Sequence, residues 1–445
     1  MNRLHPPATV LAIASQLEEA GYETWCVGGA IRDALLGHPH LDWDLATSAT
    51  PEQMRAIFGA RRTIPVGVDF GTVGVLDRDG KMHEVTTFRR DVKTDGRHAE
   101  VEFGASLNDD LARRDFTINA IAFSPSTGEV RDPFGGQQDL RRRIVRAVGD
   151  PDARMREDRL RALRAIRFAA RFGFAIDEPT RRAIDSSAPY LGRLSRERVK
   201  QELDKTMEQV RRPSAALEVW RSSGAFASLL PQLASIDALA LRAPDCLAMP
   251  GSASRPARRS LRFAALLASL STKDAGAVMS SLKASRAEVQ FVESAVDKWR
   301  RYGGEIRRAI AAGGPSDADV RRWVAGIGRL DVGSFARLAG ALWAVAREER
   351  HAVPTAGDVR RLYRRMRVIA IRDPIDLGAL AVDGDDLRRA GIPAGRSLGM
   401  ILRALLDIVI ADPTKNSVDF LLSEAQRQHE LLTANAPARR DSQET

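Results

Sequence analysis

A short segment near the start of the sequence, residues 27–46 (VGGAIRDALLGHPHLDWDLA), gathers residue types suited to nucleotide chemistry. A glycine pair lets a backbone approach a phosphate, and a helix that begins beside it favours anions. Two carboxylates two residues apart on a strand point to the same side, where they can hold one or two Mg²⁺ ions. Two such ions would activate an attacking hydroxyl and steady a leaving pyrophosphate. The segment predicts a metal-dependent triphosphate site at Gly28, Gly29, Arg32, Asp33, Asp42 and Asp44, with Asp42 and Asp44 as metal ligands.

Three short elements must position these groups. They are a buried strand at residues 25–27, a helix at 30–36 and a strand at 41–45, in which apolar and acidic residues alternate. Each signal is weak by itself, because glycine pairs also make tight turns and paired aspartates also occur on solvated strands. A dinucleotide-binding fold is excluded, because the glycines read GG-x-x-RD instead of G-x-G-x-x-G.

A hairpin is predicted next. Residues 70–76 and 82–88 are rich in β-forming types, and a turn at 77–80 joins them. Glu84 alternates with His83 and Val85, so it faces the side of the paired aspartates if the strands are neighbours. Glu84 is therefore the candidate for a third catalytic carboxylate. The alternative is a surface glutamate on an exposed strand face.

A loop and a helix are predicted to follow the hairpin. Residues 88–103 (FRRDVKTDGRHAEVEF) show no apolar periodicity, which favours a mobile loop. In residues 107–122, Leu107, Leu111 and Ile118 supply a buried helix face together with Ile121. The polar groups of this segment suit a triphosphate and a ribose, or else a solvated basic helix, and they are Arg113, Arg114, Asp115 and Asn119.

Four motifs occur in order along the chain: VGGAIRD, LDWDLAT, RRDFTINAIAF and EDRLRALRAIRFAARFGF. Together they resemble the class II tRNA nucleotidyltransferases, the family of the bacterial CCA-adding enzymes and their poly(A) polymerase relatives. The resemblance covers residues 1–210, with a weaker similarity at residues 385–422. It implies a Mg²⁺-dependent nucleotidyltransferase that uses CTP and ATP and acts on tRNA.

The last motif is predicted to be a helix over residues 157–174 that ends at Gly173. Asp158 and Arg161 are three residues apart on one helical face, and the resemblance implies that they read the incoming base. Cytosine and adenine both present an amino donor beside a ring-nitrogen acceptor, which match a carboxylate and a guanidinium, whereas uracil and guanine present the reverse pattern. By the same resemblance Arg164 and Arg167 belong to the nucleotide site; the alternative is a solvated basic stripe.

The composition fits a protein that binds a polyanion. The net charge is +10, and arginine clusters at residues 255–262 and 360–367 are candidates for contacts to the tRNA backbone. Aromatic residues make up only 6% of the chain, which favours recognition of RNA by shape and phosphate over base stacking. The two cysteines and the absence of a signal or membrane-spanning pattern lead us to expect a cytoplasmic protein. No pattern indicates an oligomeric state.

The periodicity changes near residue 148 from strands and short helices to helices alone. We therefore expect an α+β multidomain fold, with a nucleotidyltransferase head of mixed β-sheet and helices followed by an all-α neck, body and tail. The expected bounds are 1–145 for the head, 146–212 for the neck, 213–345 for the body, 346–432 for the tRNA-binding tail and 433–445 for a disordered end.

Three functions compete. The favoured one is a CCA-adding enzyme that adds two C residues and one A to the 3′ end of tRNA and releases pyrophosphate. The second is a poly(A) polymerase, although a GR[RK]F-like signature of that subgroup is not seen after the paired aspartates. A member that adds only C or only A is a variant of the first function. The third is an inactive RNA-binding relative, against which the intact Asp42, Asp44, Asp158 and Arg161 argue.

Overall fold

The computed structural model describes residues 4–38, 42–94, 99–248, 256–348 and 351–434. The chain forms two compact units: unit 1 is Met1–Ile236 with Ser281–Ala284, and unit 2 is Asp237–Ser280 with Ser285–Thr445. Among the described residues, strands occur only in unit 1. The expected fold class, a mixed-sheet head followed by helices, is confirmed.

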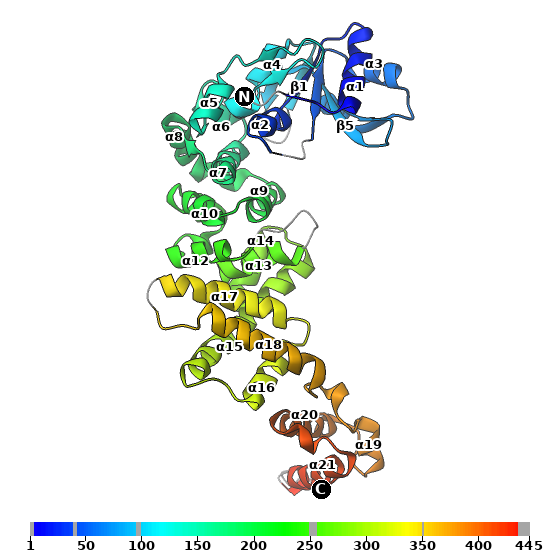
Figure 1. The fold of residues 1–445 in the computed structure, drawn as a ribbon, viewed down its shortest axis with the longest axis vertical. Coiled ribbons are helices and arrows are strands. Elements are labelled where there is room, and N and C mark those ends of the chain that lie inside the picture. Colours follow the sequence, from blue (N-terminus) through cyan, green and yellow to red (C-terminus); the bar gives the residue numbers. More distant parts are fainter. Residues whose placement is uncertain (1–3, 39–41, 95–98, 249–255, 349–350, 435–445) are drawn as a thin grey trace, which may run out of the picture. The chain divides into compact units, whose positions relative to one another are not determined.

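Seven strands of unit 1 form one mixed sheet in the order β3-β4-β5-β2-β1-β8-β9, drawn in blue and cyan in Figure 1. β2 and β5 are parallel, and the other neighbouring pairs are antiparallel. The predicted strand at 25–27 and the predicted hairpin are present as β1 and as β4 with β5. The bounds are β1 (Thr24–Val27), β2 (Asp44–Thr47), β3 (Thr63–Gly67), β4 (Thr72–Leu76), β5 (Met82–Thr87), β8 (Ala122–Phe123) and β9 (Val130–Arg131).

Amphipathic helices cover this sheet. The first of them buries Val10, Ile13 and Leu17, which recur at helical spacing, and it contacts β1. On the sheet, Trp25, Val27 and Ala46 share a face and pack with Phe88 and Leu107 into one apolar cluster. The helices of this part are α1 (Ala8–Glu19), α2 (Gly29–Leu35), α3 (Pro51–Phe58), α4 (Leu107–Ala112) and α5 (Gly136–Arg142).

Helices complete unit 1 beyond the sheet. The central one, α7, buries Leu160, Leu163 and Ile166, and it ends at Gly173, whose φ of 68° is the left-handed conformation that glycine permits. The predicted end of this helix is thus confirmed. The bounds are α6 (Pro151–Glu157), α7 (Leu160–Phe172), α8 (Glu178–Ser187), α9 (Arg196–Gln209), α10 (Pro213–Ser222) and α11 (Ala225–Leu229), with a small parallel pair β10 (Ile144–Val145) and β11 (Ala175–Ile176).

The helices from residue 238 onward bury two apolar clusters, one around Trp323, Trp343 and Met366 and one around Leu405 and Leu421. No helix in the described ranges is long and apolar enough to cross a membrane. The bounds are α12 (Ala238–Arg242), α13 (Pro256–Leu267), α14 (Thr272–Ser281), α15 (Arg286–Ala311), α16 (Asp317–Ile327), α17 (Val332–Glu348), α18 (Ala356–Arg372), α19 (Gly384–Arg389), α20 (Arg396–Ala411) and α21 (Val418–Ala434).

The loop predicted at residues 88–103 is wrong. β6 (Arg89–Thr94) and β7 (Ala99–Phe103) form an antiparallel ribbon, and residues 95–98 lie outside the described ranges. Backbone hydrogen bonds alone can pair two strands, so a ribbon forms without the apolar alternation that the sequence lacks here.

The single helix predicted over residues 107–122 is also wrong. After α4 the chain makes one 3₁₀ turn at Thr117–Asn119 and then enters β8. Phe116 pairs with Ala147 in an isolated bridge, so the chain is extended between the two helical pieces. The backbone is extended at Phe116 because it pairs there with Ala147. No apolar spacing within residues 107–122 indicates this contact.

The expected domain bounds remain predictions. α10 begins at Pro213, the residue expected to mark the end of the neck. The expected disordered end is wrong for Thr433 and Ala434, which close α21, and its remainder, residues 435–445, lies outside the described ranges. Within the arginine cluster at 255–262, residue 255 also lies outside them.

Candidate active site

A cavity of about 540 Å³ lies in unit 1 beside the sheet, and almost every predicted nucleotide-binding residue lines it. Its wall is formed by the start of α2, the start of β2, the turn after α4, one face of α7 and one face of α9. Asp33, Asp42 and Glu84 do not line it. The lining residues are Gly28, Gly29, Arg32, Asp44, Arg113, Arg114, Asp115, Asn119, Asp158, Leu160, Arg161, Arg164, Arg167, Phe168, Arg171, Arg198, Lys205 and Gln209.

The glycine pair leaves room at one end of this cavity. Gly28 has a φ of 78°, and a Cβ built there would lie 3.2 Å from Nη1 of Arg114 and 3.9 Å from a carboxylate oxygen of Asp44. A side chain at Gly28 would therefore be strained and would fill the space between the guanidinium and the carboxylate. The small residue keeps that space open for a ligand.

The acidic centre of the cavity is Asp44, the first residue of β2. β2 pairs with β5 so that Leu45 lies opposite Val85, which places Glu84 beside Asp44 on the neighbouring strand. Burial, followed by the negative charges of Glu84 and Asp42, raises the pKa of Asp44 to about 6, although Arg114 opposes the shift. Burial and the two neighbouring carboxylates together thus outweigh the effect of Arg114 on the pKa of Asp44.

The strand predicted at residues 41–45 begins later than expected. Asp42 precedes β2, its side chain is 94% exposed, and its carboxylate lies 3.6 Å from Nζ of Lys81. The argument that a shared strand face aligns Asp42 with Asp44 is therefore wrong. In the described ranges no three His, Cys, Asp or Glu side chains are gathered closely enough to hold a metal ion. The donor chemistry nevertheless fits a hard divalent cation, since the β2–β5 register places the Glu84 carboxylate opposite that of Asp44.

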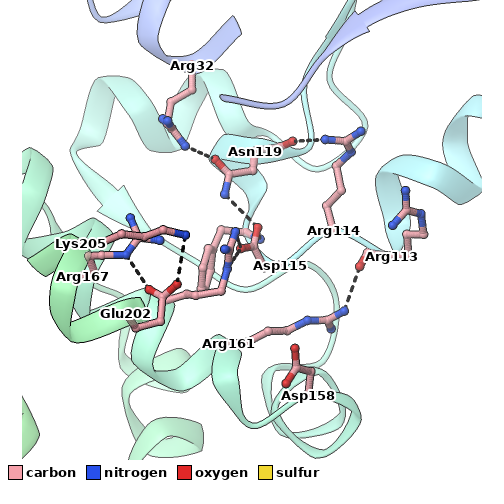
Figure 2. Close-up of polar contacts among 12 residues, drawn as sticks. Arg32, Arg113, Arg114, Asp115, Asn119, Asp158, Arg161, Arg167, Glu202 and Lys205 are labelled. Carbon is pink, nitrogen blue, oxygen red and sulfur yellow. Dashed lines mark hydrogen bonds and ion pairs between the residues drawn. The ribbon is translucent and has the colours of Figure 1, made fainter. Parts of the chain in front are cut away.

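Polar residues of the cavity wall form a connected network (Figure 2). Asp115 accepts hydrogen bonds from Nδ2 of Asn119 at 2.8 Å and from Nε of Arg164 at 2.8 Å, and Nη1 of Arg32 donates to Oδ1 of Asn119 at 2.5 Å. Burial raises the pKa of Asp115, but the charge of Arg164 and these hydrogen bonds outweigh it, so the pKa lies below its ordinary value. The network fixes two guanidinium groups, those of Arg32 and Arg164, at the cavity.

Asp33 lies behind the site and contacts two of its cations. Its carboxylate accepts from Nε of Arg32 at 2.7 Å and from Nη2 of Arg171 at 3.4 Å. Both arginines line the cavity, whereas Asp33 does not. The structure therefore places Asp33 against two arginines of the cavity wall, and not in the wall itself.

The predicted base-reading pair lines the cavity, but the two residues do not share a helix. α6 ends at Glu157 and α7 begins at Leu160, while Asp158 is extended, with φ −146° and ψ 104°. The Asp158 carboxylate accepts from the backbone N–H of Leu160 at 3.0 Å, the kind of contact by which aspartate starts a helix. The single helix predicted over 157–174 is therefore wrong at its beginning.

Separate partners hold the two members of this pair. Nη2 of Arg198 donates to Oδ2 of Asp158 at 2.7 Å. Nη1 of Arg161 donates to Glu157 at 2.7 Å, and Nη2 donates to the carbonyl oxygen of Arg113 at 3.0 Å, as Figure 2 shows for the second contact. A carboxylate and a guanidinium thus face one cavity in fixed positions, which is what recognition of an amino group beside a ring nitrogen requires.

The later arginines of α7 are not a solvated stripe. The guanidinium groups of Arg32, Arg164 and Arg167 lie 5.0, 5.4 and 4.3 Å from the ring centre of Phe168. Nε of Arg167 also donates to Glu202 at 2.5 Å, and both side chains of this pair are almost fully buried, at 4% and 2% exposed. Figure 2 shows Glu202 between Arg167 and Lys205.

Sequence reasoning missed the contribution of α9. Arg198, Lys205 and Gln209 line the cavity, and Glu202 lies on the same face of the helix. The spacings of four, three and four residues between these positions are those of one helical face. The sequence shows this polar stripe, but its assignment to the cavity requires the packing of α9 against α7.

Two parts of this chain match known protein families. Residues 24–146 match the family described as "Poly A polymerase head domain", and residues 173–237 match "Probable RNA and SrmB- binding site of polymerase A". The CCA-adding enzyme of Geobacillus kaustophilus (strain HTA426) is 35% identical over 436 residues, which cover 96% of this chain and 99% of that protein. The chain belongs to the CCA-adding enzyme family.

Further members support this relationship. The CCA-adding enzyme of Geobacillus stearothermophilus is 48% identical over 211 residues, 46% of this chain and 50% of its own length. The structure of the Bacillus stearothermophilus CCA-adding enzyme in complex with CTP has a TM-score of 0.74 and 32% identity, and the match covers 97% of this chain and all of that one. The protein is accordingly a nucleotidyltransferase, as the resemblance implied. The Thermotoga maritima CCA-adding enzyme complexed with tRNA, at 20% identity and a TM-score of 0.66, shares the fold.

Replacement of Glu202 by glutamine is expected to destabilise the folded state of the protein. Glu202→Gln leaves the buried Arg167 guanidinium without its counter-charge, which costs about 3–5 kcal/mol. Urea denaturation measures the loss. The control Glu218→Gln removes an exposed pair with Arg221 and should cost less than about 1 kcal/mol. If Glu202→Gln costs no more than the control, the pair does not stabilise the fold; the apolar double variant Arg167→Met/Glu202→Leu should recover most of the loss.

Arg198→Ala is expected to weaken the binding of CTP and of ATP to the same extent. Asp158 loses the side chain that holds Oδ2, and a charge-assisted hydrogen bond is worth about 1.5–3 kcal/mol, so the KM for CTP and for ATP should rise about tenfold. Steady-state kinetics with each nucleotide measure this, and Arg198→Lys should restore part of the affinity. A change in the Kd for tRNA with both KM values unaltered would instead place Arg198 at the RNA.

Proposed function

We propose that this nucleotidyltransferase adds C, C and A, taken from CTP and ATP, to the 3′ end of tRNA without a nucleic-acid template. The 3′ hydroxyl of the RNA loses its proton to solvent water, and its oxygen forms a bond to the α-phosphorus of the nucleotide. The bond from that phosphorus to the bridging oxygen breaks, and pyrophosphate leaves with its electron pair. The proposal follows the family to which the chain belongs and the chemistry of its cavity.

The observation that carries the proposal is the placement of Asp158 and Arg161 on one wall of the cavity that also holds Asp44. The carboxylate accepts from the amino group of cytosine or adenine, and the guanidinium donates to the adjacent ring nitrogen. Uracil and guanine would leave both groups mismatched, at about 1–3 kcal/mol for each buried unpaired group. One protein pocket thus suits both substrates of the proposed reaction and rejects the other two nucleotides.

Mg²⁺ is the divalent cation that we propose for this site, with Asp44 and Asp42 as its protein ligands and Glu84 as the third carboxylate beside them. When bound, the ion supplies charge neutralisation at the reacting phosphate and activates the hydroxyl. The chain's own arginines hold the rest of the triphosphate: Arg32 and Arg114 lie at the glycine pair, and Arg164 lies further along α7. Both cysteines, Cys26 and Cys246, are unpaired, which supports a reducing cytoplasm as the place of the reaction.

Incorporation of single labelled nucleotides tests the proposed function. The RNAs are tRNA transcripts that end before CCA, after C and after CC, with an unstructured RNA as the comparison, and Asp44→Asn supplies the background. We expect ordered addition of C, C and A that then stops. Open-ended addition of A to the unstructured RNA would make this a poly(A) polymerase. Addition of only C or only A would mark a partial enzyme, and tRNA binding without any addition would mark an inactive relative.

A further inference from the structure

A second cavity of about 520 Å³ lies on the other side of α7 within unit 1. Its apolar floor includes Phe172 and Phe174, which follow each other across the end of α7, together with aliphatic residues of α7 and α10. Four arginines line it, and no carboxylate does so in the part of the chain that the structure describes. The arginines are Arg171, Arg181, Arg211 and Arg212. Such a cavity suits a ligand with a negative charge and a flat apolar part.

Two of these arginines are available for a ligand. Arg171 is paired with Asp33, and Arg181 is paired with Asp185 and donates to Ser222. The exposed side chains of Arg211 and Arg212, by contrast, make no hydrogen bond or ion pair with any described residue. Exposed arginines without a carboxylate nearby are suited to phosphates, which they bind by paired, charge-assisted hydrogen bonds.

The second cavity is physically connected to the nucleotide cavity through α7. Arg171 lines both cavities. The ring of Phe168, which lines the first, is stacked on Phe172 with ring centres 6.0 Å apart, and Phe172 lies 5.6 Å from Phe174, both of which line the second. A row of three aromatic rings thus runs from one cavity to the other, so a ligand in the second contacts the helix that carries the base-reading Arg161.

From these features we infer that the second cavity binds an unpaired nucleotide of the RNA substrate, with its base against Phe174 and its phosphate on Arg211 and Arg212. Proteins hold single-stranded RNA by this combination of aromatic faces and cationic side chains. A volume of about 520 Å³ lies within the range of pockets that enclose a small ligand, about 300–1,000 Å³. The inference rests on the proposed function only in naming the RNA as the substrate.

Binding of a tRNA transcript without CCA, in the absence of nucleotides and over a range of salt concentrations, tests the inference. Arg211→Gln/Arg212→Gln should raise the Kd about tenfold and reduce the slope of log K against log salt by about 0.7, the value for one phosphate contact on a single strand. The matched control Arg55→Gln/Arg61→Gln removes two exposed arginines of unit 1 that do not line this cavity and should change neither quantity. The kcat at saturating tRNA and the KM for CTP should be unaltered, because the first cavity is intact.

A second variant tests the aromatic part. Phe174→Leu keeps an apolar side chain but removes the ring, and it should weaken binding of a single-stranded RNA oligonucleotide at least fivefold while a blunt RNA duplex binds as before. Unfolding midpoints measured beside the wild type show whether the fold is intact. Equal binding of the oligonucleotide by Phe174→Leu and the wild type would overturn the role given to the ring.

Other outcomes overturn the inference as a whole. Unchanged tRNA binding by the double variant, or equal weakening by the control pair, would show that the cavity does not hold RNA. Loss of CTP binding in place of tRNA binding would make it a site for free nucleotides. The proposed function is tested separately: if the wild type adds no nucleotide but the double variant still weakens tRNA binding, the function fails and the inference stands.

Discussion

Asp44→Asn is expected to abolish nucleotide addition while binding of CTP and tRNA is retained. The amide keeps the shape of the side chain, but it removes the charge that would hold a divalent cation beside the reacting phosphate. Loss of several kcal/mol of charge stabilisation corresponds to a rate reduction of more than about 10³-fold. Single-turnover incorporation of CTP into tRNA lacking CCA measures the rate, and filter binding measures the two affinities.

An exposed carboxylate supplies the control for this experiment. Asp79 lies in the turn between β4 and β5 and does not line the cavity, so Asp79→Asn removes one negative charge elsewhere in the same unit and should leave the rate unchanged. A rate for Asp44→Asn within tenfold of that of the wild type would mean that Asp44 is not a ligand of the catalytic metal.

The same variant should stabilise the fold in the absence of divalent cations. Burial and the neighbouring carboxylates raise the pKa of Asp44 from 3.8 to about 6, so the folded state holds a proton more tightly than the unfolded chain. The ionised group therefore destabilises the folded state above pH 6, by up to about 3 kcal/mol for two pKa units, and this cost vanishes below about pH 4. In EDTA, Asp44→Asn should be more stable than the wild type at pH 8 and equal to it at pH 4. A gain of equal size at both pH values would contradict this.

Short-range spacing in the sequence predicts the parts of the site that lie on regular elements. β1, α2 and the β4–β5 hairpin follow from apolar alternation and turn residues, and Gly173 ends α7 because only a left-handed residue fits there. These features depend on neighbours within a few residues. Local pattern therefore predicts the elements that carry Gly28, Gly29 and Asp44, and the pairing of Val27 with Asp44 brings these residues to one place.

Tertiary contacts decide the features that the sequence did not reveal. Asp158 leaves the helix because its carboxylate binds the N–H of Leu160 and the guanidinium of Arg198, 40 residues away. Arg167 is read from spacing as a surface residue or a nucleotide ligand, yet a carboxylate 35 residues away, that of Glu202, neutralises it in the interior. No periodicity within either segment contains this information. The polar face of α9 predicts a partner for Arg167 only when the packing of α9 on α7 is known.

Asp158→Asn is expected to collapse the preference for C and A over U and G. In the wild type both carboxylate oxygens accept hydrogen bonds, from Leu160 and from Arg198. The asparagine has one acceptor oxygen and one donor nitrogen, so it satisfies only one of these partners and presents a donor that suits the O4 atom of uracil. A site that rejects a wrong hydrogen-bonding pattern discriminates by about 10⁴–10⁵, and we expect the ratio of kcat/KM for CTP to that for UTP to fall at least 100-fold.

The pattern across all four nucleotides decides whether one pair reads both bases. Because Asp158 and Arg161 face the same cavity, Asp158→Asn should lower kcat/KM for CTP and for ATP in parallel. The control Asp152→Asn, at an exposed position of α6, should lower neither value. A loss confined to CTP would require a second reading site for adenine, and unchanged preferences would remove Asp158 from base recognition altogether. Parallel loss follows only if the protein itself, through one carboxylate and one guanidinium, supplies the hydrogen-bonding pattern that a template strand supplies in other polymerases.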